Sequence, residues 1–209
     1  MNRVLSNYLL GGVVVLLVAA ATSGQEKQKS PDYYPLAKGT KWVYRELRDG
    51  KEMGERRFEV WKVAVQGGKI TATVISSSGS GFDDATFYIY SDEKGISHEV
   101  RDEVVPLLKY PVKAKDKWSV TFKAIPPQAS DRTFTTTVVG EAEVTVPAGK
   151  FKAVEVQTVE STKTERIKES IWYAAGVGIV KRAIIWENVA DGTTEMEYGF
   201  ELKKFTPAK

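Results

Sequence analysis

The sequence predicts an all-β fold of about ten or more short strands, arranged as a single antiparallel, strongly curved sheet or as a sandwich or half-barrel. Three observations predict it. Apolar and polar residues alternate with a period of two, helical periodicity is missing almost throughout, and glycine-containing turn dipeptides separate the apolar runs. One domain of this kind is expected at 33–209, preceded by a disordered polar leader at 24–32.

Alternation is clearest in two segments, 118–124 and 195–203. In both, every second residue is apolar and its neighbours are polar, which is typical of a strand with one buried face. The predicted buried faces are Trp118, Val120, Phe122 and Ala124 in the first segment and Met196, Tyr198, Phe200 and Leu202 in the second.

The other predicted strands are rich in Val, Ile, Thr, Tyr, Phe and Trp, residues that suit a pleated surface. They lie at 41–48, 57–65, 69–76, 85–91, 95–101, 132–146, 151–160, 166–174 and 177–187. Tight hairpin turns are expected at Asp49-Gly50, Gly67-Gly68, Ala148-Gly149 and Asp191-Gly192, where glycine can adopt a positive φ. Gly140 interrupts one long run and predicts a β-bulge or bend.

Residues 1–23 have the tripartite pattern of a secretory signal. Arg3 is followed by an apolar run of ~14 residues, which is shorter than the ~20 residues needed to span a bilayer. Cleavage after Ser23, or alternatively after Ala21, is favoured over an uncleaved N-terminal anchor. The mature protein is therefore expected to be exported, either periplasmic or extracellular, with membrane contact only through this segment.

Charge and cysteine content exclude several classes of protein. The chain has 30 Lys and Arg against 27 Asp and Glu, a net charge of +3, and this mixture predicts no nucleic-acid footprint. It has no cysteine, so neither a lipid-accepting cysteine nor a disulfide is available. With a single histidine as well, zinc is not expected, and no cofactor is predicted.

A short pattern occurs twice, at 34–42 and 110–118. Tyr, Pro, an aliphatic residue, Lys and Trp stand at identical offsets in both copies. Each proline fixes an extended approach to a strand, and Trp42 and Trp118 are predicted as buried structural anchors. We hypothesise that the domain has two related halves beginning near residues 34 and 110. The alternative is two independent loop-to-strand openings with similar local chemistry.

Further structural anchors are predicted in two glycine-containing turns. Pro147 presets φ and Gly149 takes the strained position of a type II-like turn. After Trp172, Gly176 and Gly178 are followed by strand-like residues, whereas a phosphate-binding loop would lead into a helix. These two glycines therefore indicate a sharp turn and a close approach of the backbone.

The motifs at 34–42, 146–151, 172–180 and 201–205 resemble those of TapB-like proteins, a family of uncharacterised exported bacterial proteins. The signatures matched are Tyr-Pro-Leu-x-x-Gly-x-x-Trp, V-P-A-G-x-F, W-Y-A-x-G-V-G-x-V and Glu-Leu-x-x-Phe, and Ala175 stands where a proline is usual. The resemblance implies a β-rich exported domain, with a curved sheet similar to that of lipoprotein carriers. It implies no activity and no catalytic residues.

Searches for catalytic and metal-binding groups find no constellation. His98 lies in a predicted strand, where a solvent-facing or locally hydrogen-bonded imidazole is favoured over a catalytic base. The 76–81 stretch lacks the G-x-S-x-G elbow and is interpreted as a loop. The acidic pairs at 83–84 and 92–93 lack the spacing of a calcium loop. The protein is therefore predicted not to be an enzyme.

Two predicted strands are apolar on both faces and are candidates to line a cavity or a partner surface. Their candidate lining residues are Tyr88, Tyr90, Ile184 and Trp186.

Three functions follow from these observations. The first is a non-enzymatic exported domain that acts as an envelope binding or interaction module. The second is a carrier that holds an apolar ligand or lipid in a curved-sheet cavity. The third is a carboxylate-dependent hydrolase, which would need two acids at catalytic separation in a cleft. The expected partner is an apolar small molecule or an envelope protein.

Overall fold

The computed structural model describes residues 31–78, 85–100, 102–123, 131–161 and 165–209. In these ranges all regular structure is β, and no helix is long and apolar enough to cross a membrane. The twelve strands are β1 (Lys41–Arg48), β2 (Lys51–Gln66), β3 (Lys69–Ser78), β4 (Ala85–Asp92), β5 (Gly95–Val100), β6 (Glu103–Lys109), β7 (Lys117–Phe122), β8 (Arg132–Val146), β9 (Gly149–Ser161), β10 (Glu165–Ala174), β11 (Gly178–Asn188) and β12 (Thr194–Thr206).

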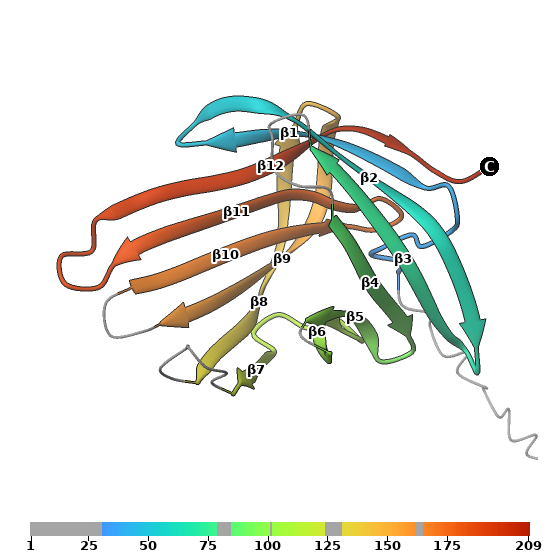
Figure 1. Ribbon diagram of the computed structural model, residues 1–209, viewed down its shortest axis with the longest axis horizontal. Coiled ribbons are helices and arrows are strands. Elements are labelled where there is room, and N and C mark those ends of the chain that lie inside the picture. Colours follow the sequence, from blue (N-terminus) through green and yellow to red (C-terminus); the bar gives the residue numbers. More distant parts are fainter. Residues whose placement is uncertain (1–30, 79–84, 101, 124–130, 162–164) are drawn as a thin grey trace, which may run out of the picture.

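All twelve strands belong to one antiparallel sheet, in the order β6-β5-β4-β3-β2-β1-β12-β11-β10-β9-β8-β7. Strands β1 to β6 form one six-stranded meander and β7 to β12 form a second, and the meanders join where β1 pairs with β12. The sheet curls until its edge strands, β6 and β7, lie near each other at the bottom of Figure 1. The all-β prediction is confirmed, and of the predicted arrangements the single, strongly curved sheet is the one observed.

Strand positions agree closely with the alternation pattern, with two differences. The strands predicted at 41–48 and 132–146 have those bounds. Several strands are longer than expected, β2 having 16 residues and β12 having 13. Strand β6 was not predicted, because Pro106 interrupts its apolar run and proline cannot donate to a ladder. Strand β6 lies at the edge of the sheet, which is where a proline is tolerated.

The predicted bulge is present, and two of the four predicted turns are at the expected residues. The pairing of β8 with β9 shifts register between Val138 and Gly140, and Gly140 has a φ of 144°, which confirms the bulge. The turns predicted at 49–50 and 67–68 are observed, whereas the β8–β9 turn lies at 147–148, one residue earlier than predicted, and the β11–β12 turn at 189–191 begins before the predicted dipeptide. The second residue of each predicted dipeptide, Gly50, Gly68, Gly149 and Gly192, nevertheless has a positive φ. These features set the curvature and the tight hairpins that let one sheet enclose an interior.

The core lies at the end of the sheet where β1 and β11 begin and β10 ends. Trp42, Tyr173 and Leu202 are at most 1% exposed there. The indole Nε1 of Trp42 donates to the carbonyl oxygen of Val177 at 2.6 Å. The N-terminal segment 33–36 packs over this end, with the ring of Tyr34 5.4 Å from that of Trp42. We call this the closed end.

The predicted signal at 1–23 and most of the leader at 24–32 lie outside the described residues. Each copy of the repeated Tyr-Pro pattern opens one of the two meanders, at β1 and β7. Trp42 and Trp118 are both buried, at 1% and 8% exposure, and both indoles donate to a backbone carbonyl. A duplication remains a hypothesis, and the topology is compatible with it.

Candidate functional site

The curved sheet encloses a cavity of about 680 Å³. Residues from both meanders line it, and most of the lining side chains are apolar or aromatic. They include Phe58, Phe87, Ile89, Phe122, Phe134 and Phe200. The volume lies within the range typical of small-molecule sites, roughly 300 to 1,000 Å³.

The cavity has a buried end and an exposed end. Tyr44 and Phe200 are 3% and 4% exposed and lie towards the closed end. At the opposite ends of the strands, Trp186 and Met196 are half-buried and Arg48 is exposed. We call this second end the open end. A ligand that fills the cavity would therefore contact aromatic side chains at the closed end and solvent at the open end.

Aromatic rings pack against one another along the wall. The ring of Tyr44 lies 4.7 Å from that of Phe200 and 5.6 Å from that of Phe58, in centroid distances. Phe122 and Phe134 form an edge-to-face pair at 5.6 Å on the other meander. Such pairs hold rings in fixed orientations, so the wall has a defined shape.

A buried carboxylate, Glu46 on β1, lies beside the cavity. It is 0% exposed and accepts hydrogen bonds from Arg56 Nε and from the Tyr198 hydroxyl, each at 2.6 Å, and from Ser78 Oγ at 2.9 Å. The four residues come from β1, β2, β12 and β3. Because a buried charge is tolerated only when it is paired and hydrogen-bonded, this cluster ties these four strands together.

A second polar group lies on the cavity wall. Arg182 Nε donates to Glu169 Oε1 at 2.5 Å, and the guanidinium lies 5.6 Å from the centroid of the Phe200 ring. His98 also lines the cavity. Burial lowers the pKa of His98, Arg182 lowers it further, and Glu169 acts in the opposite direction. His98 is therefore neutral near pH 7, and the charges of Arg182 and Glu169 balance.

One cavity-lining hydroxyl has no partner among the described residues. Tyr173 is 0% exposed, and its hydroxyl oxygen makes no hydrogen bond. Burial raises the pKa of Tyr173 well above 10, so the phenol stays neutral. An unsatisfied buried polar atom is uncommon and often marks an unoccupied hydrogen-bonding position.

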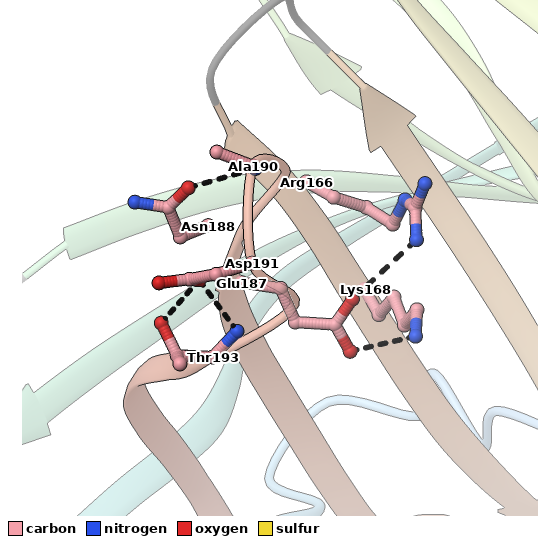
Figure 2. Close-up of polar contacts among 7 residues, drawn as sticks. All are labelled: Arg166, Lys168, Glu187, Asn188, Ala190, Asp191 and Thr193. Carbon is pink, nitrogen blue, oxygen red and sulfur yellow. Dashed lines mark hydrogen bonds and ion pairs between the residues drawn. The ribbon is translucent and has the colours of Figure 1, made fainter.

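Local hydrogen bonds and ion pairs order the β10, β11 and β12 side of the open end, as Figure 2 shows. The amide of Ala190 donates to Asn188 Oδ1, and both the amide and the hydroxyl of Thr193 donate to Asp191 Oδ1. On the neighbouring strand, Lys168 Nζ lies 2.6 Å from Glu187. These contacts hold the loop between β11 and β12 and the neighbouring strand ends in place, so this side of the open end has a defined shape.

The four predicted lining residues fall on two different faces. Ile184 and Trp186 line the cavity. Tyr88 and Tyr90 instead lie on the outer face of β4, where Tyr88 is 45% exposed and the Tyr90 hydroxyl donates to Glu99. Phe87 and Ile89, one residue removed, occupy the lining positions, because neighbouring strand residues point to opposite faces.

The predicted anchors occupy turns and packed positions. Pro147 is in the two-residue turn between β8 and β9, and Gly149 pairs with Val146 beside it.

Gly176 is in the turn between β10 and β11 and donates its amide to the carbonyl oxygen of Asp32. A Cβ on Gly178 would lie 3.2 Å from Trp42 Nε1, so its missing side chain makes room for the indole. Trp172 is half-buried, with Lys181 Nζ 5.6 Å from its ring.

Sequence reasoning missed charged residues inside the sheet, among them Glu46, Arg56, Glu169 and Arg182. The acidic pair at 83–84 and residues 79–81 lie outside the described residues. Glu46 and Glu169 are acids on the inner side of the sheet, but an arginine holds each of them. The described residues contain no cluster of three or more His, Asp or Glu side chains suited to a metal ion.

Comparison with known proteins gives a partial family match and a shared fold. Residues 111–183 match the model of a family described as DUF3108-like. No curated protein matches the chain.

Two solved structures resemble the fold. One is a Bacteroides fragilis protein described as an inferred exported protein with a YmcC-like fold. Its TM-score is 0.58 at 13% identity, over 84% of this chain and 99% of that chain. The other, from Parabacteroides distasonis, is described as an inferred lipoprotein. Its TM-score is 0.59 at 16% identity, over 86% of this chain and 100% of that chain. None of these matches supports the TapB-like name. They support a DUF3108-like segment at 111–183 and a fold that is shared with both structures.

Proposed function

We propose that this chain is an exported domain that binds and carries one apolar or amphiphilic small molecule inside its curved sheet. The observation that carries the proposal is the cavity of about 680 Å³, which aromatic and aliphatic side chains from both meanders line. One end is closed and the other leads to solvent, as a reversible carrier requires. Burial of apolar ligand surface there would contribute roughly 25 cal/mol per Å².

Export supports this role and is part of the proposal. The N-terminal segment has the pattern of a secretory signal, and the two structural neighbours are described as an inferred exported protein and an inferred lipoprotein. A carrier needs no catalytic group, and the arrangement of the interior acids agrees with this. Glu46 and Glu169 each serve an arginine, so neither is free to act as nucleophile or base.

The proposal is tested by native mass spectrometry of protein purified without detergent, and by titration with the neutral fluorescent probe N-phenyl-1-naphthylamine. We expect a co-purifying small molecule or saturable one-to-one probe binding. A clean apo mass together with no probe binding would overturn the carrier function.

A matched pair of variants locates the binding. Ile184 lines the cavity, while Ile185 is the next residue and faces outward. Ile184→Trp fills cavity space and should weaken probe binding several-fold, while Ile185→Trp should leave it unchanged. Equal effects of the two substitutions would place the probe on the outer surface.

An envelope interaction module is the second candidate function, and one feature favours it. Trp61 lies at a bulge in β2 and is 60% exposed, and Val65 on the same strand is 69% exposed. Exposed large apolar side chains often belong to protein contacts. Under this proposal Trp61→Glu would abolish capture of an envelope protein and leave probe binding intact.

A further inference from the structure

Three arginines line the cavity, and they differ in their partners. Arg56 is paired with Glu46, and Arg182 is paired with Glu169. Arg48 also lines the cavity, but within the described residues its side chain forms a hydrogen bond only with the Met196 sulfur, 3.1 Å from Nη2. A thioether is a weak acceptor and carries no charge. Arg48 therefore brings to the cavity a positive charge that no carboxylate of the described residues neutralises.

The backbone that carries Arg48 is firmly held at the open end. Arg48 is the last residue of β1 and pairs with Tyr198 of β12. The next residue, Asp49, donates its amide to the Glu197 carbonyl and accepts the Glu197 amide on Oδ1, both at 2.9 Å. The backbone of Arg48 is thus held at a fixed point of the rim, from which its side chain reaches the cavity.

Three other cations of the sheet have carboxylate partners. Arg45, on the outer face of the same strand, contacts Glu201 at 2.6 Å. Arg166 and Lys168 both contact Glu187, as Figure 2 shows. These three outer-face cations are therefore neutralised, whereas the inward-facing Arg48 has no carboxylate partner among the described residues.

We infer that the ligand is a single-chain amphiphile with an acidic head group, bound with its tail towards the closed end and its head group on Arg48. This rests on the proposed carrier function and specifies its ligand class. A guanidinium binds carboxylate or phosphate through two parallel hydrogen bonds. The reverse orientation is disfavoured, because an acid at the closed end would be desolvated and would find no unpaired cation there among the residues that the structure describes.

The test is displacement of N-phenyl-1-naphthylamine by three ten-carbon competitors: decanoate, decyl phosphate and decanol. Wild-type protein should bind at least one of the acids about tenfold more tightly than decanol, because hydrogen bonds to charged groups are the stronger ones. Arg48→Gln should remove this preference and leave the affinity for decanol unchanged. Arg45→Gln removes the same charge from the outer face and should keep the preference.

The outcomes separate the inference from the proposed function. A wild-type protein that binds the probe but does not discriminate acid from alcohol would overturn the inference alone, as would a preference that survives in Arg48→Gln. Failure of the probe to bind, together with a clean apo mass, would overturn the carrier function itself. Preference for decanoate or for decyl phosphate would identify which acid the rim accepts, and either supports the inference.

Discussion

The two meanders meet along two seams that are built differently. At the first seam, β1 pairs with β12 from Lys41, opposite Thr206, to Arg48, opposite Tyr198. At the second, β6 and β7 are the two edges of the sheet and no ladder joins them. The Trp118 indole donates across this gap to the Pro106 carbonyl at 3.2 Å. Backbone hydrogen bonds thus close the β1–β12 seam, which we call the closed seam. A side chain bridges the β6–β7 seam, which we call the open seam.

Because of this difference, a free sheet edge lies in the cavity wall. Strand β6 has 7 residues and contains Pro106, which has no N–H, whereas β12 has 13 residues. Val105 and Leu107 from β6 and Val120 from β7 all line the cavity. The open seam is therefore part of the cavity wall. A sheet closed at both seams would have no edge at which the wall could yield.

The largest expected effect separates the two tryptophans. Trp42→Ala at the closed seam should lower the free energy of unfolding by about 4 kcal/mol, because a large buried side chain is lost and leaves a cavity. Trp118→Ala at the open seam should cost about 2 kcal/mol, because this indole is more exposed and borders a sheet edge. Urea denaturation followed by circular dichroism measures both. Equal losses would show that the two tryptophans contribute equally to stability, whichever seam they occupy.

The next effect concerns the charge cluster at the closed seam. Glu46→Gln should cost about 3 kcal/mol, because it removes the charge from a fully buried side chain to which Arg56, Tyr198 and Ser78 all donate hydrogen bonds. The control is Glu143→Gln, which removes an exposed pair with Lys150 and should cost less than about 1 kcal/mol. A Glu46 variant as stable as the Glu143 variant would show that the cluster does not hold the seam.

The strand framework was predictable because it depends on local alternation. The period of two placed Val120, Phe122, Tyr198 and Phe200 on the inner face, and the structure has all four lining the cavity. Strand β6 was not predictable in this way, since a proline within an apolar run indicates a break unless the strand is known to lie at an edge. Only the complete sheet order shows that it does.

The interior charges depend on long-range pairing. Glu46 meets Tyr198, which lies 152 positions further along the chain, and no local pattern brings the two together. Tyr88 and Tyr90 illustrate a related limit. Strand β4 is apolar on both faces, so its own sequence does not say which face points inward, and the curvature of the whole sheet decides it.

A smaller effect tests the Trp118 bridge itself. Trp118→Phe keeps an aromatic ring but loses the hydrogen bond to Pro106, which should cost about 1 kcal/mol of stability. If the open seam yields when a ligand moves, the probe should dissociate faster from this variant in stopped-flow measurements. Trp172→Phe changes an indole away from both seams and should leave the dissociation rate unchanged. An unchanged rate in Trp118→Phe would mean that ligands do not pass this seam.

Acid should affect the two sides of the molecule in different pH ranges. His98, next to β6 on β5, has a folded-state pKa lowered from 6.5, chiefly by burial. The unfolded chain therefore binds the proton first, and stability falls as pH drops below about 6.5. His98→Gln should flatten this part of a stability curve measured between pH 8 and pH 5. An identical slope in the variant would contradict the assignment to His98.

At the closed seam, a group whose titration affects stability is Glu201. Burial would raise its pKa, but hydrogen bonds from Arg45 and Lys181 outweigh burial and lower it below 4.5. Its contribution to stability is present above the unfolded pKa of 4.5 and is lost as pH falls further. Amide exchange should thus show β5 and β6 loosening at a higher pH than β1 and β12.

The smallest expected effect compares two buried tyrosines, one at the closed seam and one facing it. The Tyr44 hydroxyl donates to the Ile179 carbonyl at 2.8 Å, so Tyr44→Phe should cost about 1 kcal/mol. The Tyr173 hydroxyl has no partner among the described residues, so Tyr173→Phe removes a desolvated polar atom and should change stability by less than about 0.5 kcal/mol. Thermal unfolding of both variants in parallel measures the difference. A larger loss in Tyr173→Phe would mean that this hydroxyl is hydrogen-bonded in solution, for instance to a water in the cavity that it lines. A ligand that displaced such a water would then have to supply an oxygen or nitrogen of its own at the closed end. The closed end would therefore select a neutral polar atom, whereas the rim at Arg48 would select a negative charge.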